Sequence, residues 1–197
     1  MSAPEQTLPL TRARHYAQKC AEWLAPHCHR IEIAGSIRRS RPQCGDLDLV
    51  VIPKVDITAD LLGARSTLTN HLHDFLVKYV KEHAQEAAWL QGEDQPEGKI
   101  WSLKLPRAQL DLFPATEANW GAAFLSRTGS TEHNIWLARR CQDRRMAYKP
   151  GLGIIDAKGN LLPAATEEQI YNAVGLHGIA PHNREADWLA RNLPETY

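Results

Sequence analysis

The sequence has no net charge, no long hydrophobic run and few cysteines. Its 23 basic and 23 acidic residues balance over 197 residues, so no overall positive field attracts nucleic acid, and such a partner must be held by local patches. No apolar run approaches the ~18 to 20 residues of a membrane span. The four cysteines lack paired CxxC spacing and no secretory signal opens the chain. These absences predict reduced thiols, no membrane contact and a cytoplasmic location.

Histidines close to a cysteine raise the question of a zinc site. The segment PHCHR places His27 and His29 on either side of Cys28, and His71 and His73 repeat the spacing. Structural zinc sites take ligands from two separated pairs, and no second pair here has the usual spacing. The sequence favours ordinary loop and helix histidines.

Hydrophobic periodicity divides the first 115 residues into helices and strands. Apolar side chains at helical intervals predict helices, and alternating or β-branched runs predict strands. The predicted elements are helices over 11–24 and 57–90, the latter as one or two helices, and strands over 30–34, 47–53, 99–106 and 108–115. The turn-rich segment 91–99 separates the two halves of this set, and the last two strands are expected to pair across Pro106 and Arg107.

The pattern of residues along the chain changes near Thr116, which predicts two domains, 1–115 and 116–197. Ser130 or Thr131 can cap a helix that carries three apolar side chains, and further elements follow to the end of the chain. The apolar side chains of that helix are Ile135, Ala138 and Cys141. A hairpin is expected in 153–163, turning at 158–160. Thr166 with Gln169 forms a capping box for a helix closed by Gly175, and Asn183 is expected to cap the last helix. The fold class is α+β.

Two aspartates stand at the start of a strand that is otherwise apolar. Asp46 and Asp48 are two residues apart, so their carboxylates point to the same face of the strand with α-carbons about 6.5 Å apart. Two like charges so close repel unless divalent cations lie between them, and hard Mg²⁺ ions prefer carboxylate and phosphate oxygens. Asp111, in the short apolar strand QLDLF, is the expected third ligand.

A Gly-Ser turn precedes these acids. Gly35 and Ser36 stand where a strand turns away, which leaves backbone N–H groups and a hydroxyl free to point at an anion. Arg38, Arg39 and Arg41 follow at once, and a guanidinium can hold phosphate oxygens with two donors. The turn therefore predicts a site for a triphosphate opposite the acids.

This spacing resembles the catalytic palm of the DNA polymerase beta superfamily of nucleotidyltransferases, and more narrowly the family X DNA polymerases. The residues on the family signature are Gly35, Ser36, Arg39, Gly45, Asp46 and Asp48, with Asp111 as the third metal-binding aspartate. The segment 127–138 is similar to the thumb of the family, where Thr128, Gly129 and Ser130 would shape the nucleotide pocket and Asn134 would lie near the incoming base. The segment 173–185 is similar to the ending of bacterial members.

The resemblance implies a palm with a mixed or antiparallel sheet flanked by helices, and a small α/β thumb-like lobe. It also implies two Mg²⁺ ions, for which Mn²⁺ can substitute, held by the three aspartates, and transfer from a dNTP to the 3′-hydroxyl of gapped or primer-template DNA. Arg139, Arg140, Arg144 and Arg145 would contact the nucleic acid backbone. The expected protein is a monomer that fills short gaps in DNA repair, with a separate DNA-binding or repair partner, at a bacterial nucleoid or a viral replication site.

The sequence also departs from the family. Ser126 and Arg127 replace an aromatic pair that helps to exclude ribonucleotides, and Gln109 replaces an arginine for which Arg107 is the expected substitute. Pro150 with the next glycine replaces a Glu-Tyr pair, and the chain starts at the palm, without residues for the lyase and helix-hairpin-helix domains. Two alternatives therefore stay open: a nucleotidyltransferase that is template-independent or has a non-DNA acceptor, and a binding module without catalysis.

Overall fold

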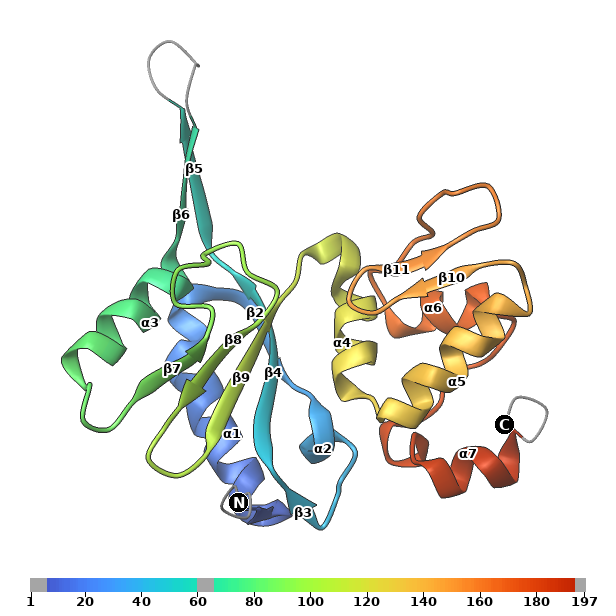
Figure 1. Cartoon of the computed structure of the whole chain (residues 1–197), viewed down its shortest axis with the longest axis horizontal. Coiled ribbons are helices and arrows are strands. Elements are labelled where there is room, and N and C mark those ends of the chain that lie inside the picture. Colours follow the sequence, from blue (N-terminus) through green and yellow to red (C-terminus); the bar gives the residue numbers. More distant parts are fainter. Residues whose placement is uncertain (1–6, 60–65, 194–197) are drawn as a thin grey trace.

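The structure, a computed structural model, describes residues 7–59 and 66–193. Its first group of elements is β1 (Leu8–Pro9), α1 (Leu10–Leu24), η1 (Ala25–His27), β2 (Cys28–Ile33), α2 (Gly35–Arg38), β3 (Gln43–Cys44), β4 (Asp46–Pro53), β5 (Val55–Ala59), β6 (Ser66–Asn70), α3 (His71–Glu82), β7 (Ala88–Gln91), β8 (Trp101–Lys104) and β9 (Gln109–Pro114). The second group is η2 (Glu117–Asn119), α4 (Trp120–Thr128), α5 (Thr131–Gln142), β10 (Ala147–Lys149), β11 (Gly153–Ile155), α6 (Glu167–Ala173), η3 (Pro181–Asn183) and α7 (Ala186–Asn192). Helix α4 lies between the sheet and the later helices (Figure 1). Within the two described ranges, no helix is both long and apolar enough to span a membrane.

A five-stranded mixed sheet organises the first group. Its strand order is β2-β4-β9-β8-β7. Strands β4 and β9 are parallel, whereas the other neighbours are antiparallel. The predicted pairing of the strands in 99–106 and 108–115 is confirmed, with Trp101 opposite Leu112. The mixed sheet and its helices confirm the predicted α+β class.

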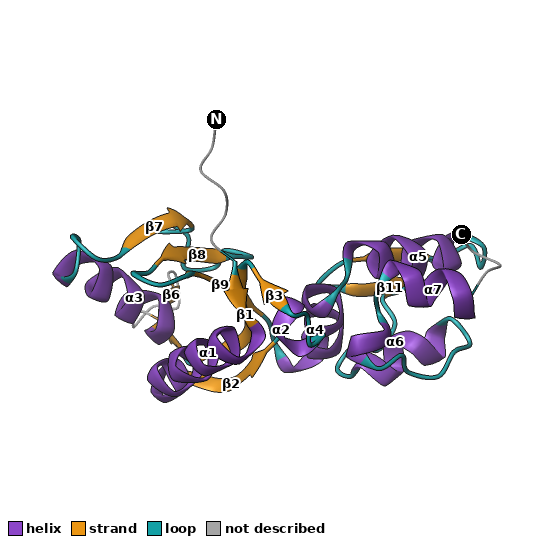
Figure 2. Cartoon of the chain, turned by 90° about the horizontal axis from the view of Figure 1, so that it is seen from below, coloured by secondary structure: helices purple, strands orange, loops and turns teal. Residues whose placement is uncertain are grey.

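The two faces of β4 have different environments. Leu47, Leu49 and Val51 are buried in one core with apolar side chains of α1 and α3, and both helices lie on the same side of the sheet (Figure 2). Because side chains alternate along a strand, Asp46 and Asp48 point to the opposite face. The acids therefore lie outside the main core although the strand is buried.

The first helix forms as predicted. It buries Ala13, Ala17 and Leu24 at helical spacing, and Pro26 falls in the 3₁₀ turn that follows, where its missing N–H ends the α-helical ladder. Strand β2 begins directly after this 3₁₀ turn.

The prediction of helix throughout 57–90 is wrong. Val55–Ala59 and Ser66–Asn70 pair as an antiparallel hairpin, with Ile57 opposite Leu68, and only His71–Glu82 is helical. The alternation of β-branched and polar residues around Ile57 suits a strand, and this side chain is 69% exposed. Leu61, which the helical spacing included, lies outside the described residues. The helix starts where the side chain of Asn70 accepts from the backbone N–H of His73.

Ser130 caps α5, as predicted, by accepting a hydrogen bond from the backbone N–H of His133. Cys141 is buried on this helix, but Ile135 is 47% exposed. The core face of this helix is formed instead by Trp136 and the residue after it.

Two predictions for the later turns are confirmed, and the predicted helix cap at Asn183 is wrong. The capping box of Thr166 with Gln169 is confirmed in α6. The predicted hairpin turning at 158–160 is confirmed in a short form: an antiparallel bridge joins Ile155 to Leu161, and the backbone N–H of Leu162 donates to the carbonyl of Ile154 at 2.9 Å. On its other edge β11 pairs with β10. Asn183 ends a 3₁₀ turn, and the cap residue of α7 is Glu185.

A third cluster of apolar side chains connects the sheet to α4. Val50 and Phe113, from the parallel pair of strands, pack with Trp120 and Ala123 of that helix. Helix α4 thus covers the far part of the sheet face that carries the acids. The boundary between 1–115 and 116–197 stays a prediction.

Candidate active site

Three carboxylates meet on one face of the sheet. In the parallel register of β4 and β9, Asp48 lies opposite Asp111, and Asp46 lies two residues earlier on the same face. One ligand oxygen from each residue lies within 4.8 Å of the others. Asp111 is 7% exposed and the other two are half-buried. Within the described ranges this is the single group of three or more His, Cys, Asp or Glu side chains close enough to share a metal.

The electrostatics of this group favour a cation. Burial, together with the charges of Asp46 and Asp111, raises the pKa of Asp48, and the cations Arg39 and Arg127 act in the opposite direction. A carboxylate that resists ionisation between two others is stabilised when a divalent ion neutralises the set. An all-oxygen donor set fits Mg²⁺ or Mn²⁺.

Asp111 is held by its own strand. Gln109 Nε2 donates to both carboxylate oxygens of Asp111, at 3.0 and 3.1 Å. The predicted substitution by Arg107 is wrong: its guanidinium contacts the Tyr16 hydroxyl at 3.2 Å. Gln109 can reach Asp111 because residues two apart on a strand point to the same face, whereas Arg107 lies in the turn before the strand.

Only glycine fits at the turn beside Asp48. Gly35 has φ +57°, and a Cβ there would lie 1.8 Å from Asp48 Oδ2. The backbone N–H of Ala34 donates to the carbonyl of Asp48 at 2.8 Å. The Ser36 hydroxyl is buried and has no hydrogen-bond partner among the described residues. A buried hydroxyl without a partner beside a tight turn fits an anionic group as its missing acceptor.

The arginines after this turn contact the second group of elements. Arg38 Nη1 donates to Thr128 Oγ1 at 2.7 Å and to Glu167 at 2.6 Å, and its guanidinium stacks on Phe124 at 3.7 Å. Arg39 donates to the Thr128 carbonyl and, through Nε, to Glu185 at 2.7 Å. Acidic partners for these arginines were not predicted from the sequence.

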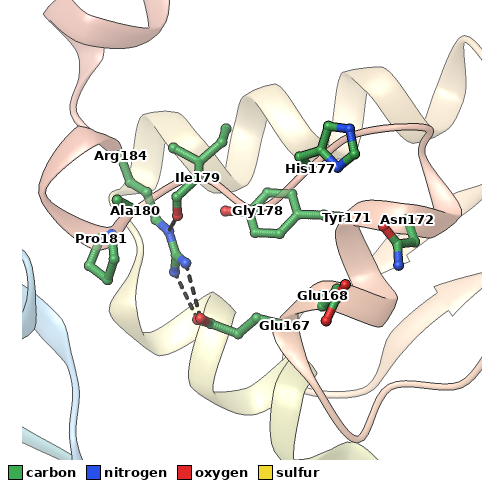
Figure 3. Close-up of a pocket in the computed structure, with 10 residues that line it drawn as sticks. All are labelled: Glu167, Glu168, Tyr171, Asn172, His177, Gly178, Ile179, Ala180, Pro181 and Arg184. Atoms are coloured by element: carbon green, nitrogen blue, oxygen red, sulfur yellow. Dashed lines mark hydrogen bonds and ion pairs between the residues drawn. The ribbon is translucent and has the colours of Figure 1, made fainter.

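Glu167 connects two guanidinium groups. Besides Arg38, it accepts from Arg184 at 2.9 and 3.1 Å, and Arg184 also donates to the Ile179 carbonyl (Figure 3). Burial opposes ionisation of Glu167, but hydrogen bonds from both arginines outweigh it and lower its pKa to about 2. The Arg184 side chain is only 2% exposed. A cavity of about 440 Å³ opens beside this pair, next to Tyr171.

The Thr-Gly-Ser turn lies against Arg39. Thr128 ends α4 fully buried, and Gly129 follows with φ +65°. A Cβ at Gly129 would lie 3.4 Å from Nη1 of Arg39. Asn134 Nδ2 donates to the carbonyl of Ser126 at 2.8 Å, so the amide is already positioned by the turn that precedes it.

Ser126 and Arg127 occupy different environments. Ser126 is buried and donates to the carbonyl of Ala123 at 3.0 Å. The exposed Arg127 places its guanidinium 4.2 Å from the Phe113 ring centroid. Phe113 lies two residues after Asp111 and on the same face, so Arg127 brings a positive charge toward the acids.

A groove of about 340 Å³ opens beside Asp46, which is one of its lining residues. Gly45, Lys104, Arg107 and Gln109 are among its lining residues. Two basic side chains beside an acidic group suit a polyanion that must come close to a metal site.

The arginines of α5 and the following turn are divided in their contacts. Arg140 Nε donates to the Val174 carbonyl at 3.3 Å, and Arg144 donates to the carbonyl of Arg140 at 3.4 Å. Arg140 therefore packs on the lobe itself, whereas Arg139, Arg144 and Arg145 are exposed.

The histidines considered above as zinc ligands have structural contacts. His27 stacks on Phe75 at 4.1 Å, and His71 Nε2 lies 2.7 Å from an oxygen of Asp56. His73 Nε2 lies 2.9 Å from the carbonyl of Gly92. These contacts anchor α3 and the loop after β7.

Comparisons with known proteins agree with this architecture. Residues 123–185 match the family model of the DNA polymerase beta thumb, and no curated protein matches the chain. Two solved structures of polymerase beta from Leishmania infantum are similar, a ternary P/T complex with a TM-score of 0.67 and a ternary gap complex with 0.66. Each is 15% identical and covers 91% of this chain, which covers 77% and 71% of theirs. The chain therefore has a family X polymerase-like fold with a polymerase beta thumb segment.

Proposed function

We propose that this protein is a DNA polymerase X-like nucleotidyltransferase that adds nucleotides from dNTPs to a DNA 3′-hydroxyl and fills short gaps in repair. The observation that carries the proposal is the register of the parallel strands, which sets Asp111 opposite Asp48 and beside Asp46 on one face of the sheet. The similarity to polymerase beta in a gap complex supports gapped DNA as the substrate.

Asp46, Asp48 and Asp111 would hold two Mg²⁺ ions, and Mn²⁺ has the same preference for oxygen ligands. When bound, such ions lower the pKa of the attacking hydroxyl and offset charge on the leaving pyrophosphate. Gln109 fixes the orientation of Asp111 through both carboxylate oxygens. In this proposal Asp111 would accept a proton from the hydroxyl.

The triphosphate would lie at the Gly-Ser turn. The Ser36 hydroxyl, the Gly45 backbone N–H and the Arg39 guanidinium are the donors proposed for its β- and γ-phosphates. The 3′-oxygen attacks the α-phosphorus, the bond to the bridging oxygen breaks, and pyrophosphate leaves. The groove lined by Lys104 and Arg107 is the proposed path of the primer strand to Asp46.

The carboxyl-terminal lobe, residues 116–197, would form the thumb and cover the nucleotide. Gly129 and Ser130 would border its sugar, and Asn134 its base. Of the four arginines, Arg139 and Arg145 are free of contacts in the described part of the chain that would compete with a DNA backbone, so they are the stronger candidates for that role. Each phosphate contact should steepen the log-log salt dependence of binding by about 0.9.

Incorporation of labelled nucleotides on a one-nucleotide gap, a recessed primer and single-stranded DNA tests the proposal. Template-matched addition on the gap with Mg²⁺ is expected, and it should be lost in Asp46→Asn and Asp111→Asn. Asp74→Asn, an exposed acid on α3, is the matched control and should retain activity. Addition without regard to the template, or none on any DNA, would contradict the gap-filling role.

A second candidate is a nucleotidyltransferase that works without a template or on another acceptor. Ser126 and Arg127 favour it, because neither side chain supplies the aromatic wall expected to exclude a 2′-hydroxyl. Parallel reactions with rNTPs separate the two. Equal use of rNTPs and dNTPs on single strands would support this candidate over repair synthesis.

A further inference from the structure

Two arginines expected to hold phosphates already bind a carboxylate of the second lobe. Arg39 Nε donates to Glu185 Oε1 at 2.7 Å, and Arg41 Nη1 lies 3.5 Å from Glu185 Oε2. The side chains of Arg39 and Glu185 are 15% and 24% exposed, so water screens this contact only in part. Both oxygens of one carboxylate are thus directed at the turn that begins with Gly35.

Carboxylate and phosphate oxygens compete for the same guanidinium donors. A triphosphate placed at the Ser36 hydroxyl would approach Arg39 while Glu185 still neutralises it. Its own negative charge would also be repelled by Glu185. The two anions cannot use Nε of Arg39 at the same time, because that atom carries one hydrogen.

We infer that Glu185 is an internal stand-in for the triphosphate: it occupies Arg39 and Arg41 in the free protein, is displaced when the nucleotide binds, and so sets the affinity for the nucleotide. The inference rests on the proposed function, because it concerns the same triphosphate site. It assigns to Glu185 the role of a positioning residue, which acts on the nucleotide through Arg39.

The neighbouring residue explains why this exchange can be local. Arg184 is anchored by its side chain to Glu167 and to the Ile179 carbonyl, and its own carbonyl accepts from the backbone N–H of Ser130 at 3.2 Å. Glu185 directly precedes α7 and has non-helical backbone angles. Its side chain can therefore leave Arg39 while the anchor at Arg184 stays in place.

The opposite interpretation is that Glu185 only ties the two lobes together. A structural tie predicts that removing its charge weakens nucleotide binding or leaves it unchanged, because the site would become looser. A competing anion predicts tighter binding. The direction of the change in affinity therefore separates the two.

The test is calorimetric binding, to the full chain, of a dNTP with an imido group in place of the α–β bridging oxygen, in Mg²⁺. Glu185→Gln keeps the shape of the side chain and removes its charge, and it should bind roughly three- to tenfold more tightly, as expected for loss of one partly screened charged partner. Glu168→Gln makes the same change at an exposed position of α6 and should bind like the unmodified chain.

Glu185→Asp supplies a second variant that keeps the charge and shortens its reach to Arg39. It should give an intermediate gain in affinity, which a folding defect would not produce. Unchanged or weaker binding by Glu185→Gln, with binding by the unmodified chain intact, overturns the inference and leaves the proposed function. No binding by the unmodified chain overturns both.

Discussion

The exchange Glu167→Gln tests the contact that joins the Gly-Ser turn to the second lobe. Glu167 accepts from Arg38 at 2.6 and 2.9 Å and from Arg184 at 2.9 and 3.1 Å. Glutamine keeps the size of the side chain, but it removes the charge and turns an N–H₂ group toward one of the guanidinium groups. The buried Arg184 would then lack its counter-ion.

The magnitude follows from the pKa of Glu167. Burial works against ionisation, yet the two arginines lower this pKa from 4.5 to about 2, which corresponds to about 3 kcal/mol of stability. Loss of one partner of a buried ion pair typically costs about 3 to 5 kcal/mol. We expect the free energy of unfolding to fall by about 3 kcal/mol at pH 7, with a Tm lower by about 6 to 12 °C.

The pH dependence carries the sharper test. The folded pKa of Glu167 is depressed, so its contribution is complete above the unfolded value near 4.5 and is lost as the pH falls toward 2. The stability gap between the unmodified chain and Glu167→Gln should therefore narrow below pH 4.5. Urea unfolding followed by tryptophan fluorescence measures it, with Glu168→Gln as the control. A gap under about 1 kcal/mol at pH 7, or one unchanged at pH 3, would refute the reasoning.

Three further predictions concern the site itself. Gly35→Ala should abolish nucleotide incorporation and lower Tm, because the new Cβ would lie 1.8 Å from Asp48 Oδ2 at a φ of +57°; incorporation by gel and thermal melting measure both effects. Asp48→Asn should raise the Tm of the metal-free protein and remove its increase with Mg²⁺, because the raised pKa of Asp48 means that ionisation costs stability as the pH rises above about 4; a higher metal-free Tm that appears only above that pH is the expected scan. Arg127→Met should lower the Mn²⁺ concentration for half-saturation several-fold, since a cation next to Asp48 and Asp111 opposes metal binding; electron paramagnetic resonance of free Mn²⁺ reports it, and an unchanged concentration would argue against the repulsion.

The acids could be predicted from the sequence because their reason is local. A carboxylate pair two apart in LDLVV needs no knowledge of the fold to be recognised as unusual, and the same holds for Asp111 in its apolar strand. What the sequence could not supply was the parallel register that sets Asp111 opposite Asp48. That register joins segments about sixty residues apart, and it depends on how β9 enters the sheet between β4 and β8.

The elements that were predicted wrongly are those with weak or ambiguous patterns. Short apolar runs around Ile57 and Leu68 fit helix and strand alike, and the hairpin exposes Ile57 to solvent, so burial does not decide between them. The sequence does not single out Glu167. Its two arginine partners lie 129 residues before it and 17 residues after it, which no local pattern contains.

Adjacent arginines at the turn have different roles because their surroundings differ. Arg38 is enclosed by the Phe124 ring, Thr128 and Glu167, so its guanidinium is already paired in the contact between the two lobes. Arg39, the next residue in the sequence, instead contacts Glu185, which directly precedes α7. Although the chain has zero net charge, Arg39 can therefore offer a positive charge to a triphosphate, provided that the triphosphate can displace Glu185 from it. Affinity for a triphosphate then depends on the cost of moving Glu185, and not on the number of arginines in the turn.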